Sequence, residues 1–233
     1  MDIHLGRGLG LDERGFFQKL VLERRGGWCY EMNGLFAWAL RELGFQVNYL
    51  AGAVPRVSAG PNAHGNHLVL LVHLPKGDFI ADVGFGDGFL EPIPLRAGTY
   101  TQNGLAFRLE PGPDERWTVH NHPHGGAATY DFGLEPYALW DFQERCGWLQ
   151  TSPESGFVRT TVCQRFTPEG IVTLRGAVLK TIGPRGVSQQ VLEGETEYRQ
   201  VLREIFGLQV DTTRLWPWVW ARHLDWVGSQ ETV

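Results

Sequence analysis

The sequence has few cysteines, no long hydrophobic runs and no excess of positive charge, and each shortage excludes a class of protein. Only three of its 233 residues are cysteine, and they show no Cys-x-x-Cys spacing, so neither a disulfide framework nor a zinc knuckle is indicated. No apolar run approaches the roughly 20 residues of a membrane-spanning helix, and the first residues lack the apolar core of a signal peptide. The net charge of -5 and the pI of 5.9 argue against a nucleic acid or an anionic membrane as the main partner. We therefore expect a cytoplasmic protein with reduced thiols.

What the chain does contain is the composition of an ordinary globular protein. With 42% hydrophobic and 20% charged residues, it can bury a core as one large domain or as two to three small lobes. Helical and strand periodicities alternate along it. The predicted segments are helices at residues 12–25, 29–43 and 196–206, strands at residues 45–51, 67–74, 79–85, 170–174 and 177–182, a small antiparallel barrel within residues 91–150, and an aromatic helical tail at residues 215–226.

Cys29 stands where a helix is predicted to begin. Apolar residues follow it at steps of three and four, and Gly44 is a typical helix stop. The unpaired N–H groups and the positive dipole end of a first helical turn favour a thiolate, and the Arg-Arg-Gly-Gly stretch at residues 24–27 adds nearby charge and room for a substrate. Two interpretations follow, an activated nucleophile or a buried structural thiol at the start of a core helix.

A predicted hairpin supplies a histidine and an aspartate on one face of a sheet. Its strands are residues 67–74 and 79–85, joined by a short turn. A turn centred on the Pro-Lys pair between them places Asp82 opposite Val69, two residues from His67 and on the same face. That diagonal spans about 7–8 Å, within reach of an imidazole and a carboxylate that lean together. Taken singly, His67 is also explained as the start of a strand and Asp82 as a polar residue bonded to local backbone.

Cys29, His67 and Asp82 are the three residue types of a cysteine-dependent catalytic group. A thiolate nucleophile needs a base to generate it, and an imidazole needs a partner that sets its tautomer and stabilises its charged form. Cys29, His67 and Asp82 supply the nucleophile, the base and the orienting group. Papain-like and transglutaminase-like acyl-transfer enzymes are built in this order, with the cysteine at a helix N-terminus and the other two residues on adjacent strands.

The remaining histidines and cysteines are interpreted as structural. His120, His122 and His124 alternate along one extended segment, but no nearby cysteine or carboxylate completes a metal site, and no metal is expected. Cys146 and Cys163 have neither an adjacent histidine nor a helix-start signal.

Five segments of the sequence match a known pattern. They are RGGWCYEMN at residues 25–33, HLVLLV at residues 67–72, DVGFG at residues 82–86, TSPESGF at residues 151–157 and FGL at residues 206–208. In their order and approximate spacing these segments resemble the arylamine N-acetyltransferases, over about residues 2 to 210. The resemblance covers the three candidate catalytic residues and extends far beyond them.

The resemblance implies both a fold and a reaction. The fold would be α+β, with a cysteine-proteinase-like arrangement of a helical lobe at residues 1–44, an antiparallel β-barrel at residues 45–152 and an α/β lid at residues 153–233. The reaction would be a ping-pong transfer of acetyl from acetyl-coenzyme A, through a Cys29 thioester, to an arylamine, hydrazine or related amine, as in xenobiotic metabolism. Phe85 would line the pocket for the acceptor amine, while the residues that bind coenzyme A are not identified.

Members of the family begin with a further helical segment, and this chain opens just past it. Either the true start lies upstream, or the first lobe is shortened and exposes an apolar face, which would favour a homo-oligomer. Two other functions stay open at this point. One is an amide synthase or thiol hydrolase that uses the same three residues on another acyl donor, and the other is an inactive relative that acts as a binding module.

Overall fold

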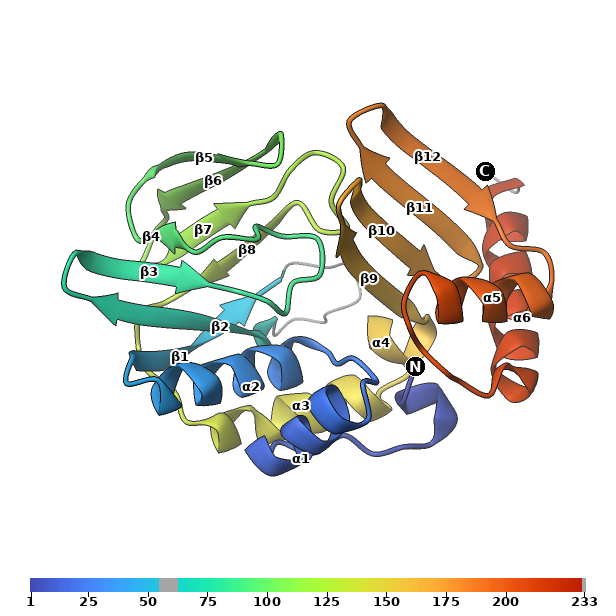
Figure 1. Cartoon of the computed structure of the whole chain (residues 1–233), viewed down its shortest axis with the longest axis horizontal. Helices are drawn as coiled ribbons and strands as arrows, with labels where there is room; N and C mark the ends of the chain where they lie inside the picture. The colour runs from blue at the N-terminus through green and yellow to red at the C-terminus, as the bar shows by residue number, and fades with distance from the viewer. Residues whose placement is uncertain (55–62, 232–233) are drawn as a thin grey trace. The chain divides into compact units, whose positions relative to one another are not determined.

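The structure is a computed structural model that describes residues 1–54 and 63–231. It divides into two compact units, which we call the first unit, Gly10–Leu149, and the second unit, Met1–Leu9 together with Gln150–Val233. Figure 1 shows the helices and strands of both. The division into three lobes that the sequence suggests stays a prediction. Among the described helices, none is both long and apolar enough to cross a lipid bilayer.

Two helical segments precede the sheet of the first unit. Helix α1 spans Glu13–Phe17 and continues into a π-helical turn, η2, at Gln18–Leu22. Helix α2 spans Cys29–Glu42, and the chain leaves it through Gly44, whose φ of 88° lies in the left-handed region that favours glycine. The predicted helix start at the cysteine is therefore confirmed. The helix predicted over residues 12–25 is shorter than expected, because its second half is wound as a π turn.

Eight strands of the first unit form one antiparallel sheet that curls into a nearly closed barrel (Figure 1). The order across the sheet is β4-β3-β2-β1-β8-β7-β6-β5. The strands are β1 Gln46–Ala53, β2 His64–Leu74, β3 Gly77–Ala81, β4 Ile93–Pro94, β5 Gly98–Gln102, β6 Leu105–Pro111, β7 Trp117–His120 and β8 Thr129–Phe132. The last part of the segment predicted as barrel is instead helical, with η3 at Leu139–Phe142 and α3 at Gln143–Thr151.

The register of the β2–β3 hairpin decides which side chains meet beyond its open end. Leu70 faces Ala81, and the pairing runs without a bulge to the turn. One further step pairs Val69 with Asp82, which is the register predicted from the sequence and is thereby confirmed. Strand β3 ends at Ala81, so Asp82 lies just past its last residue, where the chain is free to bend toward β2.

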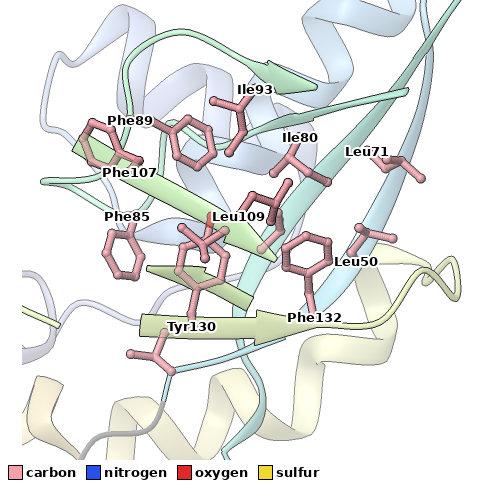
Figure 2. Packing of buried hydrophobic residues seen from close by; sticks show 13 residues of the cluster. Leu50, Leu71, Ile80, Phe85, Phe89, Ile93, Phe107, Leu109, Tyr130 and Phe132 are labelled. Carbon is pink, nitrogen blue, oxygen red and sulfur yellow. The ribbon is translucent and has the colours of Figure 1, made fainter. Parts of the chain in front are cut away.

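The barrel is filled by a hydrophobic core that reaches to the side of Asp82. Its labelled members point inward from several strands and from the segment after β3 (Figure 2). These residues are Leu50, Leu71, Ile80, Phe85, Phe89, Ile93, Phe107, Leu109, Tyr130 and Phe132. Five of these ten side chains are aromatic, and each of the five buries a large apolar area. The core therefore gives the two strands that carry His67 and Asp82 a rigid support.

The second unit combines a smaller antiparallel sheet with helices. Its strands lie in the order β12-β11-β10-β9, and helices α5 and α6 pack with the sheet around a separate core. The strands are β9 Val162–Thr167, β10 Gly170–Arg175, β11 Val178–Gly183 and β12 Gly186–Val191, and the helices are α4 Gly156–Arg159, α5 Glu195–Glu204 and α6 Thr212–Glu231, with the short η1 at Ile3–Leu5. The predicted strand pair, the predicted helix near residue 196 and the helical aromatic tail are all present.

Candidate active site

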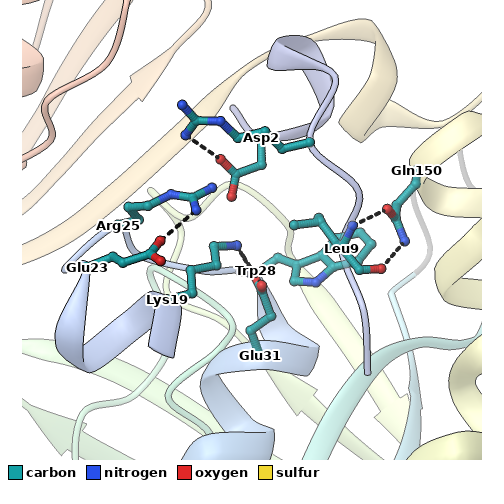
Figure 3. A network of polar contacts seen from close by, with 9 residues as sticks. Asp2, Leu9, Lys19, Glu23, Arg25, Trp28, Glu31 and Gln150 are labelled. Atoms are coloured by element: carbon teal, nitrogen blue, oxygen red, sulfur yellow. Dashed lines mark hydrogen bonds and ion pairs between the residues drawn. The ribbon is translucent and has the colours of Figure 1, made fainter. Parts of the chain in front are cut away.

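Cys29 is the first residue of α2, and a buried ion pair holds that helix start in place. The Glu31 carboxylate accepts a hydrogen bond from the Trp28 backbone N–H at 3.2 Å, which satisfies one of the unpaired donors of the first turn. Lys19 Nζ lies 2.6 Å from Glu31 Oε2 in a pair that is largely shielded from solvent (Figure 3). Cys29 is itself buried, with Sγ 3.9 Å from the Asn66 carbonyl oxygen. The positive end of the α2 dipole thus lies at the thiol.

His67 and Asp82 form a buried pair beside this helix start. The Nε2 atom of His67, on β2, lies 2.6 Å from Oδ2 of Asp82, just after β3. The two residues are only 2% and 7% exposed, so solvent screens their interaction little. Sequence periodicity placed them on one face across a diagonal, and the structure closes the remaining gap by leaning the two side chains together.

Cys29 lies beside the His67 imidazole. It is close enough to add to the rise of the His67 pKa, after the larger effect of Asp82. Because Nε2 is held by the carboxylate, Nδ1 is the ring nitrogen left to meet the sulfur. The structure thus brings together all three residues that the sequence singled out, in the order thiol, imidazole, carboxylate.

The charges of His67 and Asp82 stabilise each other, and this shifts the pKa of both groups. Burial lowers the pKa of His67, but the negative charge of Asp82, its hydrogen bond and the interactions with Cys29 outweigh burial and raise this pKa to about 10. Burial likewise raises the pKa of Asp82, but the positive charge and hydrogen bond of His67 outweigh it, so the net pKa lies below its ordinary value. The pair is therefore an imidazolium and a carboxylate at neutral pH.

Asn33 supports the carboxylate, and the sequence analysis did not assign it a role. Its Nδ2 donates to Asp82 Oδ1 at 2.9 Å and to the Leu68 carbonyl at 2.6 Å, and its Oδ1 accepts from the Val83 N–H at 2.8 Å. One fully buried side chain thus connects α2 to β2 and to the segment after β3. A signal was present, because Asn33 follows Cys29 by one helical turn on the same face and stands within the first matched segment.

Gly84 allows the segment after β3 to approach α2. A Cβ atom at this position would lie 2.6 Å from Cys29 Cα and 2.8 Å from Asn33 Nδ2, closer than real Cβ contacts. The Gly84 N–H also donates to Asp82 Oδ1 at 2.9 Å. A side chain here would therefore push apart the helix that carries the thiol and the segment that carries the carboxylate.

Gly84→Ala is expected to lower the free energy of unfolding by about 1–3 kcal/mol, as other overpacked sites do. It should also slow the reaction of Cys29 with iodoacetamide, because His67 then no longer meets the thiol correctly. Urea unfolding and the rate of alkylation measure the two effects. Gly147→Ala is the matched control, since no atom of the described residues outside its own helical turn lies within 4 Å of its Cβ position. Wild-type unfolding and alkylation in Gly84→Ala would contradict the close approach.

Two aromatic rings form a wall beside the imidazole. Phe85, which the resemblance assigned to an acceptor pocket, lies with its ring centroid 5.3 Å from that of His67. Tyr130, on β8, lies 5.0 Å from His67 and 4.8 Å from Phe85. Burial and then the nearby charge of Asp82 raise the pKa of the Tyr130 hydroxyl well above its ordinary value, so it stays neutral. Tyr130 has no local sequence signal, because only the order of strands in the sheet brings it here.

The alternating histidines have structural partners. His120 pairs with Glu110 at 2.6 Å, whereas buried His122 donates from Nε2 to the Asp87 carbonyl at 3.0 Å. The His124 N–H in turn donates to His122 Nδ1 at 3.3 Å. Within residues 1–54 and 63–231, histidine, cysteine and carboxylate side chains form no group of three that could hold a metal ion.

The other two cysteines lie outside this group of three. Cys146 is buried in α3, and Cys163 lies on β9 in the second unit. Burial raises the pKa of Cys163 to about 11, which keeps its thiol protonated and unreactive at neutral pH.

Comparison with known proteins places this site in context. A family model described as N-acetyltransferase matches residues 1–215. Arylamine N-acetyltransferase 2 of Mus musculus is 30% identical over 240 residues, which cover 91% of this chain and 82% of that protein.

Solved structures agree with the sequence match. An arylamine N-acetyltransferase of Mycobacterium marinum has a TM-score of 0.84 at 28% identity, over 94% of this chain and 84% of that one. Its complex with CoA has a TM-score of 0.83 at 28% identity, with the same coverage of both chains. The enzyme of Salmonella typhimurium has a TM-score of 0.82 at 29% identity, over 94% of this chain and 84% of that one. The expected α+β class with a cysteine-proteinase-like arrangement is thereby confirmed.

Proposed function

Since the chain belongs to the arylamine N-acetyltransferase family, we propose that it moves an acetyl group from acetyl-coenzyme A, through a thioester on Cys29, to an arylamine, hydrazine or related amine. The observation that carries this proposal is the buried His67–Asp82 pair, whose Nε2 and Oδ2 atoms lie 2.6 Å apart, with Cys29 close enough to the imidazole to affect its pKa. A nucleophile, a base and an orienting group in mutual contact are the parts that acyl transfer requires.

In the first half-reaction, the Cys29 thiolate attacks the carbonyl carbon of acetyl-coenzyme A. The C–S bond to coenzyme A breaks as the new thioester forms, and His67 gives its proton to the departing sulfur. Asp82 holds the imidazole in place and stabilises its charged form before this transfer, which is the role of the third residue in such a group. Coenzyme A then leaves, and His67 is neutral.

In the second half-reaction, the acceptor amine attacks the acetyl carbon on Cys29. Neutral His67 takes the proton that the amine loses, and the cysteine leaves as a thiolate beside the new imidazolium. The N-acetylated product departs, and the charge pair of the resting enzyme is restored. The Cys29 sulfur thus receives the acetyl group from the first substrate and gives it to the second. Because the first product leaves before the second substrate reacts, the mechanism is ping-pong.

Two further observations support the choice of substrates. The Mycobacterium marinum relative was solved in complex with CoA, and 94% of this chain aligns with it. The Phe85 and Tyr130 rings place apolar aromatic groups directly beside His67, which suits an aromatic amine because aromatic rings favour stacked or edge-on contacts. We therefore assign Phe85 to the acceptor pocket.

Intact mass spectrometry tests the proposal directly. Wild-type protein mixed with acetyl-coenzyme A and no amine, then quenched in acid, is expected to gain one acetyl group on Cys29. Addition of aniline before the quench should remove that group and yield acetanilide, while coenzyme A alone should leave the mass unchanged. A protein that gains no acetyl group and acetylates no amine would refute the proposal, and would favour an enzyme that uses another acyl donor.

A further inference from the structure

Strand β12 is an outer strand of the four-stranded sheet in the second unit, and its edge is unusually bare. It lies at the end of the strand order, next to β11 only (Figure 1). All six residues of Gly186–Val191 are exposed, and none is charged or proline. Proteins commonly protect an edge strand with a lysine, a proline, a bulge or a covering segment, because its free backbone groups pair with any other strand. None of the described residues provides such protection here.

The hairpin that precedes β12 determines which backbone groups point outward. Gly183 faces Gly186 across a turn of two residues, and this closing pair of a two-residue hairpin exchanges hydrogen bonds. Hydrogen-bonded and non-hydrogen-bonded pairs alternate along an antiparallel ladder. The N–H and C=O groups of Val187, Gln189 and Val191 therefore point away from β11, toward the open edge.

This pattern is complementary to itself under a two-fold axis. If two copies of β12 run antiparallel with the axis at Gln189, each Gln189 faces the partner subunit's Gln189, and Val187 faces the partner subunit's Val191. All three outward residues then meet outward residues, which gives three hydrogen-bonded pairs with two bonds each. A register shifted by one residue would set outward groups against inward ones.

The side chains agree with the same register. Val187 and Val191, each about two-fifths exposed, lie on the face of the sheet that also carries buried Ile182, so the pairing would extend an apolar row across the joint. In this register, Arg185 would lie opposite the partner subunit's Glu193 just beyond the ladder, and this would occur twice by symmetry. Within the described part of the chain, neither charged side chain has an ion-pair partner of its own.

From these agreements we infer that a second copy of this chain is the partner of β12. The two copies join edge to edge about a two-fold axis at Gln189, and their four-stranded sheets become one sheet of eight strands. Such an interface is isologous and closed, as in most homodimers. It is also small, because it consists mainly of one strand from each copy, so the dimer forms in a concentration-dependent manner.

Sedimentation velocity over a range of protein concentrations tests this register. Wild type should shift from monomer to dimer as concentration rises. Gln189→Lys sets two like charges directly opposite each other at the axis and should weaken the dimer about tenfold or more. Ser188→Lys is the matched control, because it adds the same charge to the same strand but on the other face, opposite the partner subunit's Gln190 and not opposite itself. Circular dichroism melts check that both variants fold.

A charge exchange tests the ends of the ladder. Arg185→Glu alone and Glu193→Arg alone each place like charges together twice and should weaken the dimer, whereas the double variant should restore wild-type association. A protein that stays monomeric at every concentration would overturn the proposal and leave the edge to a foreign strand. A dimer that none of these substitutions affects would overturn it as well.

Discussion

Cys29→Ser is expected to abolish acetyl transfer, with a loss of more than about a thousandfold in the rate of amine acetylation. A serine hydroxyl has nearly the same size as the thiol but ionises far less readily, so the His67 imidazole cannot generate a useful nucleophile from it. The surrounding fold should persist, because the change removes no buried carbon and keeps one hydrogen-bonding group. Initial rates with acetyl-coenzyme A and aniline measure the loss, and intact mass should show no acetylated protein.

The other cysteines supply the controls for this experiment. Cys146→Ser and Cys163→Ser should retain most of the wild-type turnover, since both lie outside the group formed by Cys29, His67 and Asp82. A comparable loss in either variant, with a normal melting transition, would overturn the assignment of Cys29 as nucleophile. Each protein must first be shown to unfold cooperatively, because a polar serine in a buried position also costs stability.

Asp82→Asn should slow acetylation of Cys29 by about two to four orders of magnitude in a protein that still folds. The amide keeps the shape of the carboxylate but removes the charge that stabilises the His67 imidazolium, and it favours the wrong tautomer of the ring. Rapid mixing with acetyl-coenzyme A, followed by intact mass, measures the acetylation step alone. The loss should therefore appear in the chemical step and not in binding.

The pH dependence of thiol alkylation should change in a definite direction. In wild type, the charge of Asp82 outweighs burial and raises the pKa of His67 to about 10, so a positive charge lies beside the Cys29 sulfur throughout the neutral range. We expect rapid reaction with iodoacetamide even at pH 6. In Asp82→Asn the effect of burial remains while the main opposing charge is gone, so the pKa of His67 falls. The thiolate loses its counter-ion, and the alkylation profile should move to higher pH.

Stability must be separated from mechanism in this variant. Loss of one partner of a buried charge pair can cost about 3–5 kcal/mol, so rates are compared only below the measured melting transition. Asp87→Asn is a matched control, because Asp87 is also buried but bonds to the Gly126 N–H and to Asn121 instead of to His67. It should lose stability without a shift of the alkylation profile. A folded Asp82→Asn protein with near-normal acetylation and an unmoved profile would reduce the mechanism to a Cys29–His67 pair.

Local periodicity was sufficient for the elements that carry the three site residues. The helix start at Cys29 follows from apolar spacing and the glycine that ends the helix, and both belong to one continuous segment. The β2–β3 register follows from a short turn, because a hairpin leaves few ways to align two adjacent strands. The five matched segments added the family, the fold class and the reaction that we propose, which no periodicity could supply.

The sequence predicted secondary structure less reliably in two other segments. Residues 12–25 have the pattern of one amphipathic helix, yet their second half winds as the π turn η2. Residues 139–151 were assigned to the barrel but form η3 and α3. In both places the local sequence pattern did not specify the observed backbone conformation, since tertiary context routinely overrides a weak local propensity.

By itself, then, the sequence determined where Cys29, His67 and Asp82 stand on their own elements, because backbone periodicity and a short turn are local properties. Only the tertiary structure decided that these elements meet. Gly84 lets the carboxylate segment reach α2, Asn33 connects that helix to the carboxylate, and the pairing of β1 with both β2 and β8 brings Tyr130 to the imidazole. Such contacts join residues far apart in the chain, and they depend on how whole strands and helices pack, which no single segment specifies.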